Sequence, residues 1–177
     1  MTSKMDFTTD EWKVLSDAPL VVGGAVVAAA PNGAIGTIKE GMALVKSMMT
    51  AAQRHPNNRL IQEVVPKGMS REHVDLWTNV VQTVMQQSET ERMTTAGTET
   101  CQKVAMILQS KADPQEADEF KRWLLEIGEN VANADREDRN IGSNLSPRET
   151  ELLSMMSSAL GVTHIPSPSG SQTYMQP

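Results

Sequence analysis

Apolar residues recur at intervals of three and four along most of this 177-residue chain. The clearest stripe follows Asp113, with apolar positions at Ala117, Phe120, Leu124, Ile127, Val131 and Ala134. Charged and polar residues occupy most of the positions between them. Because this spacing places the apolar side chains on one face of an α-helix, it predicts an amphipathic helix that covers part of a core.

Four further segments show the same period. Their apolar positions are Ile38, Met42, Val45, Met49 and Ala52 after Thr37; Val74, Trp77, Val81 and Val84 after Ser70; Met93, Gly97, Cys101, Val104 and Leu108 near Glu89; and Leu152, Leu153, Met156 and Leu160 after Ser146. No segment alternates apolar and polar residues for long enough to predict a strand. The sequence therefore predicts an all-α fold, an irregular bundle of six or seven helices.

Helix starts are marked by capping boxes, in which Ser, Thr or Asp stands three residues before Glu. The four boxes are Thr8 with Glu11, Thr37 with Glu40, Asp113 with Glu116 and Ser146 with Glu149. Pro114 and Pro147 follow two of these caps, at the position where the missing N–H of proline costs no hydrogen bond. Gly161 predicts the end of the last helix. Pro19 predicts an interruption of the first one.

The longest apolar run extends from Ala18 to Pro31 and is shorter than the roughly 20 residues that a membrane span needs. Gly23, Gly24 and the alanines beside them form a smooth face that allows two helices to approach closely. We therefore expect a buried core helix and no membrane span. The helical pattern predicts a single helical domain at residues 1–162. The Pro- and Ser-rich composition of residues 163–177 predicts a disordered tail.

Two helix–turn–helix stretches are alike, one from Gly24 to Met49 and one from Gly128 to Met156. In each, a predicted helix ends in small residues and is followed by a polar turn. An Ile-Gly pair comes next, and a capping box marks the start of the second predicted helix. Shared turn chemistry explains this likeness, and so does an internal repeat of a helix hairpin. A repeat predicts that Ile35 and Ile141 fill equivalent gaps between their hairpin helices.

At these hairpins the sequence resembles the TerB-like, tellurite-resistance-associated family of all-helical bacterial proteins. The segment Asn32-Gly33-Ala34-Ile35 with Glu40 is similar to the family's turn of the type Asp-Gly-x-Ile and its capped restart. The segment from Leu145 to Val162 is similar to the closing helix of the family. The resemblance implies a helical, stress-associated module, with metal binding at acidic positions that this chain partly retains.

Composition and charge limit the classes of function that this chain can have. The net charge of −6 and the pI of about 5.1 disfavour binding to a nucleic-acid backbone. A single cysteine, Cys101, excludes an internal disulfide, and its place on an apolar stripe predicts a buried thiol. The histidines, His55, His73 and His164, belong to no Glu-x-x-His or His-Glu-x-x-His motif. We therefore predict no catalytic residue and no resident cofactor.

An acidic segment after the Asp113 helix is a candidate metal site. Asp135, Glu137 and Asp138 could supply oxygen ligands to Ca²⁺, Mg²⁺ or Mn²⁺ from a predicted turn. Arg136 and Arg139 neutralise the segment, which favours a solvated charged loop. The loop lacks the ligand spacing of an EF-hand.

Two methionine pairs are candidates for partner binding because flexible thioethers make adaptable apolar surfaces. We expect Met49 and Met156 in the core, with Met48 and Met155 at the edge of their stripes. Core filling in a chain with few aromatic residues is the favoured explanation of the pairs, and a partner groove or a homodimer face is the alternative.

These observations favour a non-enzymatic helical module that binds a protein partner or a second copy of itself. The alternative is a divalent-metal sensor or buffer that uses the acidic segment at 135–138. No apolar region follows Lys4, so no secretory signal is predicted and a cytoplasmic location is expected.

Overall fold

The computed structural model describes residues 2–29, 44, 46, 48–65, 90–137 and 145–163, with the backbone alone at 90 and 134–137. Every regular element in these ranges is a helix, and no strand occurs among them. The elements are η1 (Lys4–Asp6), α1 (Thr9–Ala29), α3 (Arg59–Val64), α5 (Thr90–Lys111), α6 (Pro114–Glu137) and α7 (Pro147–Leu160), together with helical residues at 44, 46 and 48–52. The predicted all-α helical bundle is confirmed.

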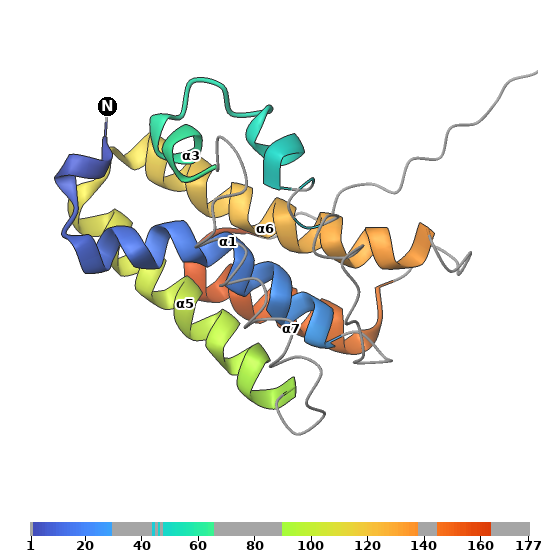
Figure 1. The fold of residues 1–177 in the computed structure, drawn as a ribbon. Helices are drawn as coiled ribbons and strands as arrows, with labels where there is room; N and C mark the ends of the chain where they lie inside the picture. Colours follow the sequence, from blue (N-terminus) through green and yellow to red (C-terminus); the bar gives the residue numbers. More distant parts are fainter. Residues whose placement is uncertain are drawn as a thin grey trace, which may run out of the picture.

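Among the described residues, the four long helices α1, α5, α6 and α7 form the body of the bundle (Figure 1). Helix α1 lies in its middle and contacts α5, α6 and α7. Helices α1 and α6 run in one direction, whereas α5 and α7 run in the opposite one. The helical residues 48–52 and α3 pack against α6. The bundle therefore has one side on which α6 is covered and another on which α5 and α7 lie next to each other.

Helix α1 continues through Pro19, so the predicted interruption was wrong. An interior proline costs a helix roughly 3 kcal/mol. Against this cost, every residue from Ala18 to Ala29 except Val21 is buried. Because α1 is surrounded by the other long helices, tertiary packing outweighs the local penalty.

Glycines let the helices approach as closely as the smooth face of α1 predicted. A Cβ added to Gly97 of α5 would lie 2.6 Å from the Cβ of Ala25 on α1 and 2.5 Å from the Cε of Met156 on α7. A Cβ added to Gly23 would overlap Leu44. Helix α5 and Leu44 therefore meet α1, and α7 meets α5, at distances that only small residues permit.

The predicted core stripe of α5 is confirmed, and so is that of α6 except for Ala134, whose side chain lies outside the described residues. On α5 the buried positions are Met93, Gly97, Cys101, Val104 and Leu108. On α6 they include Ala117, Phe120, Leu124, Ile127 and Val131. Trp123 extends this face, is fully buried and stacks edge-on against Phe120 with ring centroids 5.2 Å apart.

Two of the capping boxes form as predicted. The Ser146 hydroxyl accepts from the Glu149 N–H, and the Glu149 carboxylate accepts from the Ser146 N–H. Thr8 and Glu11 make the same exchange. Gly161 ends α7 in the left-handed conformation with φ 68°, as expected.

The box at Asp113 forms only in part. The Asp113 carboxylate caps α6 by accepting from the N–H groups of Gln115 and Glu116. The Glu116 carboxylate accepts from the Thr2 N–H at 2.6 Å, while the Asp113 N–H donates to the Thr2 hydroxyl at 2.8 Å. Because Thr2 inserts between the two partners of the box, the start of the chain is tied to the start of α6.

Several predictions lie outside the described residues. They are the box at Thr37 and Glu40, the helix after Ser70, the positions of Ile35 and Ile141 in the hairpin repeat, His73 and His164, and the tail beyond Thr163. Val162, directly before the predicted tail, packs against the core.

Helix α1 is the one helix in the described ranges that is long and apolar enough to cross a membrane by length and composition. Most of its apolar stretch is buried within the bundle. Core helices of soluble proteins and signal sequences near an N-terminus meet the same criterion.

Candidate functional site

The predicted acidic turn is partly helical. The backbone of Asp135 and Glu137 belongs to the last turn of α6, so the prediction of a turn at these positions was wrong. Their side chains and all of Asp138 lie outside the described residues. Within the described ranges no three His, Cys, Asp or Glu side chains form a group that could hold a metal ion. The metal site at 135–138 stays a prediction.

The two methionine pairs differ in a way the sequence did not indicate. Met155 is 50% exposed and Met156 is fully buried, as predicted. Met48 is 1% exposed and Met49 is 47% exposed, so the predicted edge position of Met48 was wrong. The first methionine enters the core at residues 48–49 and the second at residues 155–156. The pairs therefore do not occupy equivalent positions.

The cause is the helix register at residues 44–52. Leu44, Met48, Ala51 and Ala52 are all buried, at spacings of four, three and one. This stripe is offset by one residue from the predicted stripe through Val45 and Met49. Both stripes have helical period, and the packed one meets Gly23 through Leu44 and lies against Trp123 through Met48. Neighbouring helices selected the stripe.

Exposed Met155 borders an open groove between α5 and α7, which lie side by side in Figure 1. The groove has a volume of about 1000 Å³. The residues that line it are Ala29, Glu91, Thr94, Thr95, Thr98, Glu99, Gln102, Arg148, Glu151, Leu152 and Met155. It is the site in the described part of the chain where a sequence-predicted interaction residue meets a sizeable hollow.

The groove combines an apolar base with a wall on which two threonine hydroxyls, those of Thr94 and Thr98, are already hydrogen-bonded. Leu152 is only 3% exposed and continues into the core, whereas Met155 stands half in solvent. The hydroxyl of Thr94 donates to the Glu91 carbonyl, and that of Thr98 donates to the Thr94 carbonyl. Because these donors are used within α5, a ligand does not need to satisfy them.

Charged side chains surround this base. Glu91, Glu99 and Glu151 contribute three carboxylates, and Arg148 contributes one guanidinium. All four side chains belong to exposed residues. None of them forms an ion pair with another residue that the structure describes. The groove therefore presents unpaired charge of predominantly negative sign.

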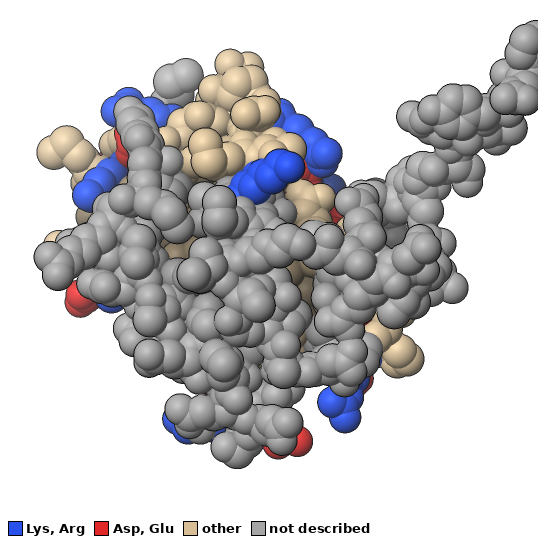
Figure 2. Space-filling view, turned by 45° about the vertical axis from the view of Figure 1, so that its right-hand side comes forward, with Lys and Arg blue, Asp and Glu red and all other residues tan. Residues whose placement is uncertain are grey.

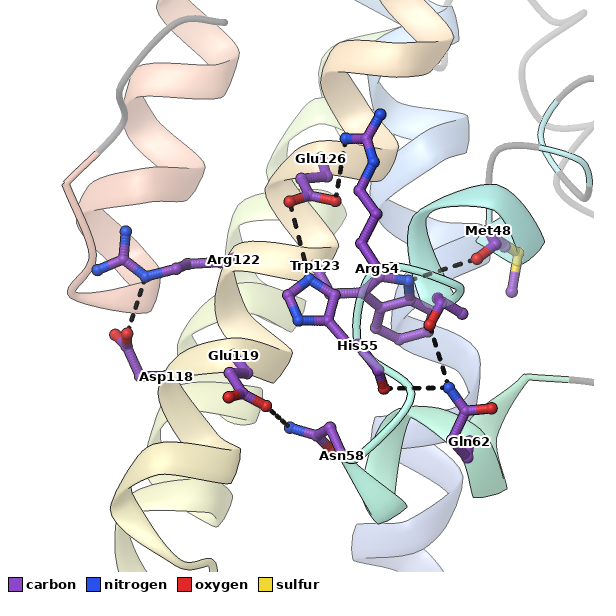
Figure 3. Close-up of polar contacts among 11 residues, drawn as sticks. Met48, Arg54, His55, Asn58, Gln62, Asp118, Glu119, Arg122, Trp123 and Glu126 are labelled. Atoms are coloured by element: carbon purple, nitrogen blue, oxygen red, sulfur yellow. Dashed lines mark hydrogen bonds and ion pairs between the residues drawn. The ribbon is translucent and has the colours of Figure 1, made fainter.

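The opposite side of the bundle holds a second polar cluster, where residues 48–62 meet α6 (Figure 3). The side-chain amide of buried Asn58 donates to the Glu116 carbonyl at 2.9 Å and to the Glu119 carboxylate at 3.0 Å. Asn58 also caps α3 by accepting from the Ile61 N–H. Hydrogen bonds from Asn58 and Gln115 lower the pKa of Glu119. This cluster joins α3 to α6.

Further polar side chains lie above Asn58 at the same junction (Figure 3). Glu126 of α6 lies 3.7 Å from His55 Nε2 and 3.6 Å from Arg54 Nη1 (Figure 3). The Trp123 indole N–H donates to the Met48 carbonyl, and the Gln62 amide donates to the carbonyls of Ala52 and His55. These groups cap the end of the helical residues 48–52 and bind them to α6. The arrangement is structural.

Cys101 is confirmed as a core residue. It is fully buried on α5, and burial raises the pKa of its thiol to about 12. Since the thiolate is the reactive form, this side chain is inert at neutral pH.

On the face drawn in Figure 2, basic side chains of the described residues lie in several separate places rather than in one area. A continuous basic surface is the usual footprint of nucleic-acid binding. That drawn face does not present one among its described residues.

The sequence identified Met155 but missed the rest of the groove. A signal was present on α5, where Glu91, Thr95, Thr98, Gln102 and Met106 recur at spacings of three and four on the face away from the core stripe. Met106 is 62% exposed. An exposed, partly polar stripe is ordinary on a surface helix, so its importance emerges only when α7 is placed beside it.

Comparison with protein-family models, with curated proteins and with solved structures gave no match.

Proposed function

We propose that this protein is a non-enzymatic interaction module that binds a helical segment of a protein partner in the groove between α5 and α7. The single observation that carries the proposal is Met155, which is half exposed beside the buried Leu152 over a hollow of about 1000 Å³. A half-exposed thioether next to an apolar base is suited to adaptable contact with another apolar side chain.

A helix is the partner structure that fits this shape. Glu91 and Gln102 mark the two ends of the α5 wall, and they are roughly 17 Å apart along a helix axis. The two walls are themselves helices that run in the same direction. A third amphipathic helix laid along them would bury its apolar face, as in helix-in-groove recognition. A stress-associated role is the part of this proposal that rests on the TerB-like resemblance alone.

The test uses three synthetic amphipathic peptides, each about 18 residues long, which is enough to span the groove. They share one leucine face and carry Lys, Gln or Glu at the flanking positions. Protein labelled with ¹³C at its methionine methyl groups is titrated with each peptide. We expect the Met155 resonance to shift with at least one peptide, because its methyl group borders the groove.

Met49 supplies a matched control, because its exposed fraction of 47% is close to the 50% of Met155 and it does not line the groove. We expect Met155→Ser to weaken binding about tenfold, a loss of roughly 1.4 kcal/mol, and Met49→Ser to leave it unchanged. If no peptide moves the Met155 resonance, or if both variants weaken binding equally, the groove is not the binding site and the proposal fails.

A further inference from the structure

The charges around the groove specify the chemistry of its partner. Resting on the function proposed above, we infer that the groove takes a basic amphipathic helix, with Lys or Arg flanking an apolar face at positions seven or eight residues apart. The occupant is a segment of another protein rather than a second copy of this chain. Four observations carry this inference.

The first is the excess of unpaired carboxylates. Glu91, Glu99 and Glu151 line the groove together with one cation, Arg148, and none of the three carboxylates has an ionic partner in the described ranges. Elsewhere on the described surface carboxylates are commonly paired, as in Asp17 with Lys13 and Glu63 with Arg59. A cationic partner would supply the missing charge.

The second observation is the spacing of these carboxylates. Glu91 and Glu99 stand eight residues apart on α5, which is roughly 12 Å along the helix axis. A helix lying along α5 spans the same distance between positions seven or eight residues apart. Two basic residues at that spacing can therefore meet both carboxylates at once, while Glu151 approaches from the α7 wall.

The third observation is the apolar path between the charges. Leu152 and Met155 are three residues apart on α7, so they lie on one face of that helix. On α5, exposed Met106 follows Gln102 by four residues and extends the wall beyond the groove. The apolar face of a partner helix thus finds contact along the base and again at Met106.

The fourth observation separates a foreign partner from self-association. The whole chain carries a net charge of −6, so two copies repel each other at long range, and a basic partner is attracted. An exposed acidic groove adds to this attraction at close range.

The test compares the Lys, Gln and Glu peptides for affinity, by fluorescence anisotropy at low and high salt. We expect the Lys peptide to bind at least tenfold more tightly than the Gln peptide and the Glu peptide to bind most weakly. Raising the salt concentration should weaken binding of the Lys peptide and leave the Gln peptide nearly unaffected, because screening acts on the charges alone. Equal affinities for the Lys and Gln peptides would overturn the inference and leave the proposed function standing.

Two variants test whether the carboxylates of the groove are the charges that attract the Lys peptide. The triple variant Glu91→Gln, Glu99→Gln, Glu151→Gln should bind the Lys peptide about tenfold more weakly, since partly exposed ion pairs each contribute modestly. The control variant also removes three negative charges, but at positions outside the groove: Asp10→Asn, Asp17→Asn, Asp118→Asn. We expect the control to change affinity less than twofold. Equal losses in both variants would show that net charge, and not the groove, attracts the peptide, and would overturn the inference.

Self-association is the remaining outcome. Analytical ultracentrifugation of the wild-type chain and of the Met155→Ser variant should give the same monomeric profile. A wild-type dimer that dissociates in the Met155→Ser variant would identify a second copy as the occupant and overturn the inference.

Discussion

The surface of α6 and the surface between α5 and α7 differ in what their polar groups bond. On α6, residues 48–62 cover the helix, and its polar groups reach across to them: the Trp123 indole bonds the Met48 carbonyl, and Glu119 accepts from Asn58. Between α5 and α7 no described element lies over the groove. There the hydroxyls of Thr94 and Thr98 bond their own helix, and the carboxylates form no ion pair with a residue that the structure describes.

The comparison shows how a covered surface can be told from an available one. On a covered surface the polar groups form hydrogen bonds with a neighbouring element, because a buried polar group without a partner lowers the stability of the fold. An available surface satisfies its donors locally and leaves its charges to solvent. Exposed apolar side chains mean more on the second kind of surface, since nothing within the described chain uses them.

The largest predicted difference between the two sides concerns Trp123. Replacing it by Ala removes a fully buried indole together with its hydrogen bond to the Met48 carbonyl. We expect Trp123→Ala to lower the free energy of unfolding by about 3–5 kcal/mol, measured by chemical denaturation. The matched change on the open side, Met155→Ala, should alter it by about 0.5 kcal/mol or less. Comparable losses would mean that the open side is as tightly packed as the covered one.

An intermediate effect is expected at Asn58. Asn58→Ala leaves the Ile61 N–H and the Glu116 carbonyl without this partner and removes a donor to Glu119. Because Asn58 is buried, we expect a loss of about 1–3 kcal/mol in the free energy of unfolding. Asn58→Asp keeps the oxygen that caps α3 but places a second carboxylate beside Glu119. It should therefore be more destabilising at pH 7 than at pH 4, and a pH-independent loss would contradict this account.

The smallest effect concerns pH. Hydrogen bonds from Asn58 and Gln115 lower the pKa of Glu119 in the folded state. A lowered pKa contributes stability above the ordinary pKa of glutamate, and this contribution is lost as the pH falls through the lowered value. We expect Glu119→Gln to reduce stability by about 0.5 kcal/mol or less at pH 7, and the difference from wild type to vanish in acid. Thermal unfolding across this pH range measures it, and a difference that persists at low pH would refute the assignment.

The fold could be predicted in unusual detail wherever one local pattern dominated. The stripes of α5 and α6 match the buried residues from Met93 to Leu108 and from Ala117 to Val131. The box at Ser146 also forms as its residues predict. In each case the deciding interactions join residues three or four apart, so the sequence contains both partners.

Predictions failed where a distant residue decided between local alternatives. Two overlapping stripes ran through residues 44–52, and the positions of Gly23 and Trp123 selected the one that buries Met48. Glu116 had a local partner available and bonds Thr2 instead. Pro19 breaks helices locally, yet α1 passes through it because its neighbours bury it.

The sequence by itself determined that this chain is helical, where its best-marked helices begin and end, and which face of α5 and α6 is apolar. These properties follow from hydrogen bonds and side-chain spacings within one or two helical turns. Only the tertiary structure decided which methionines are exposed, what Glu116 bonds and where a groove opens. Those outcomes depend on helices that are far apart in the sequence and meet only when the bundle packs.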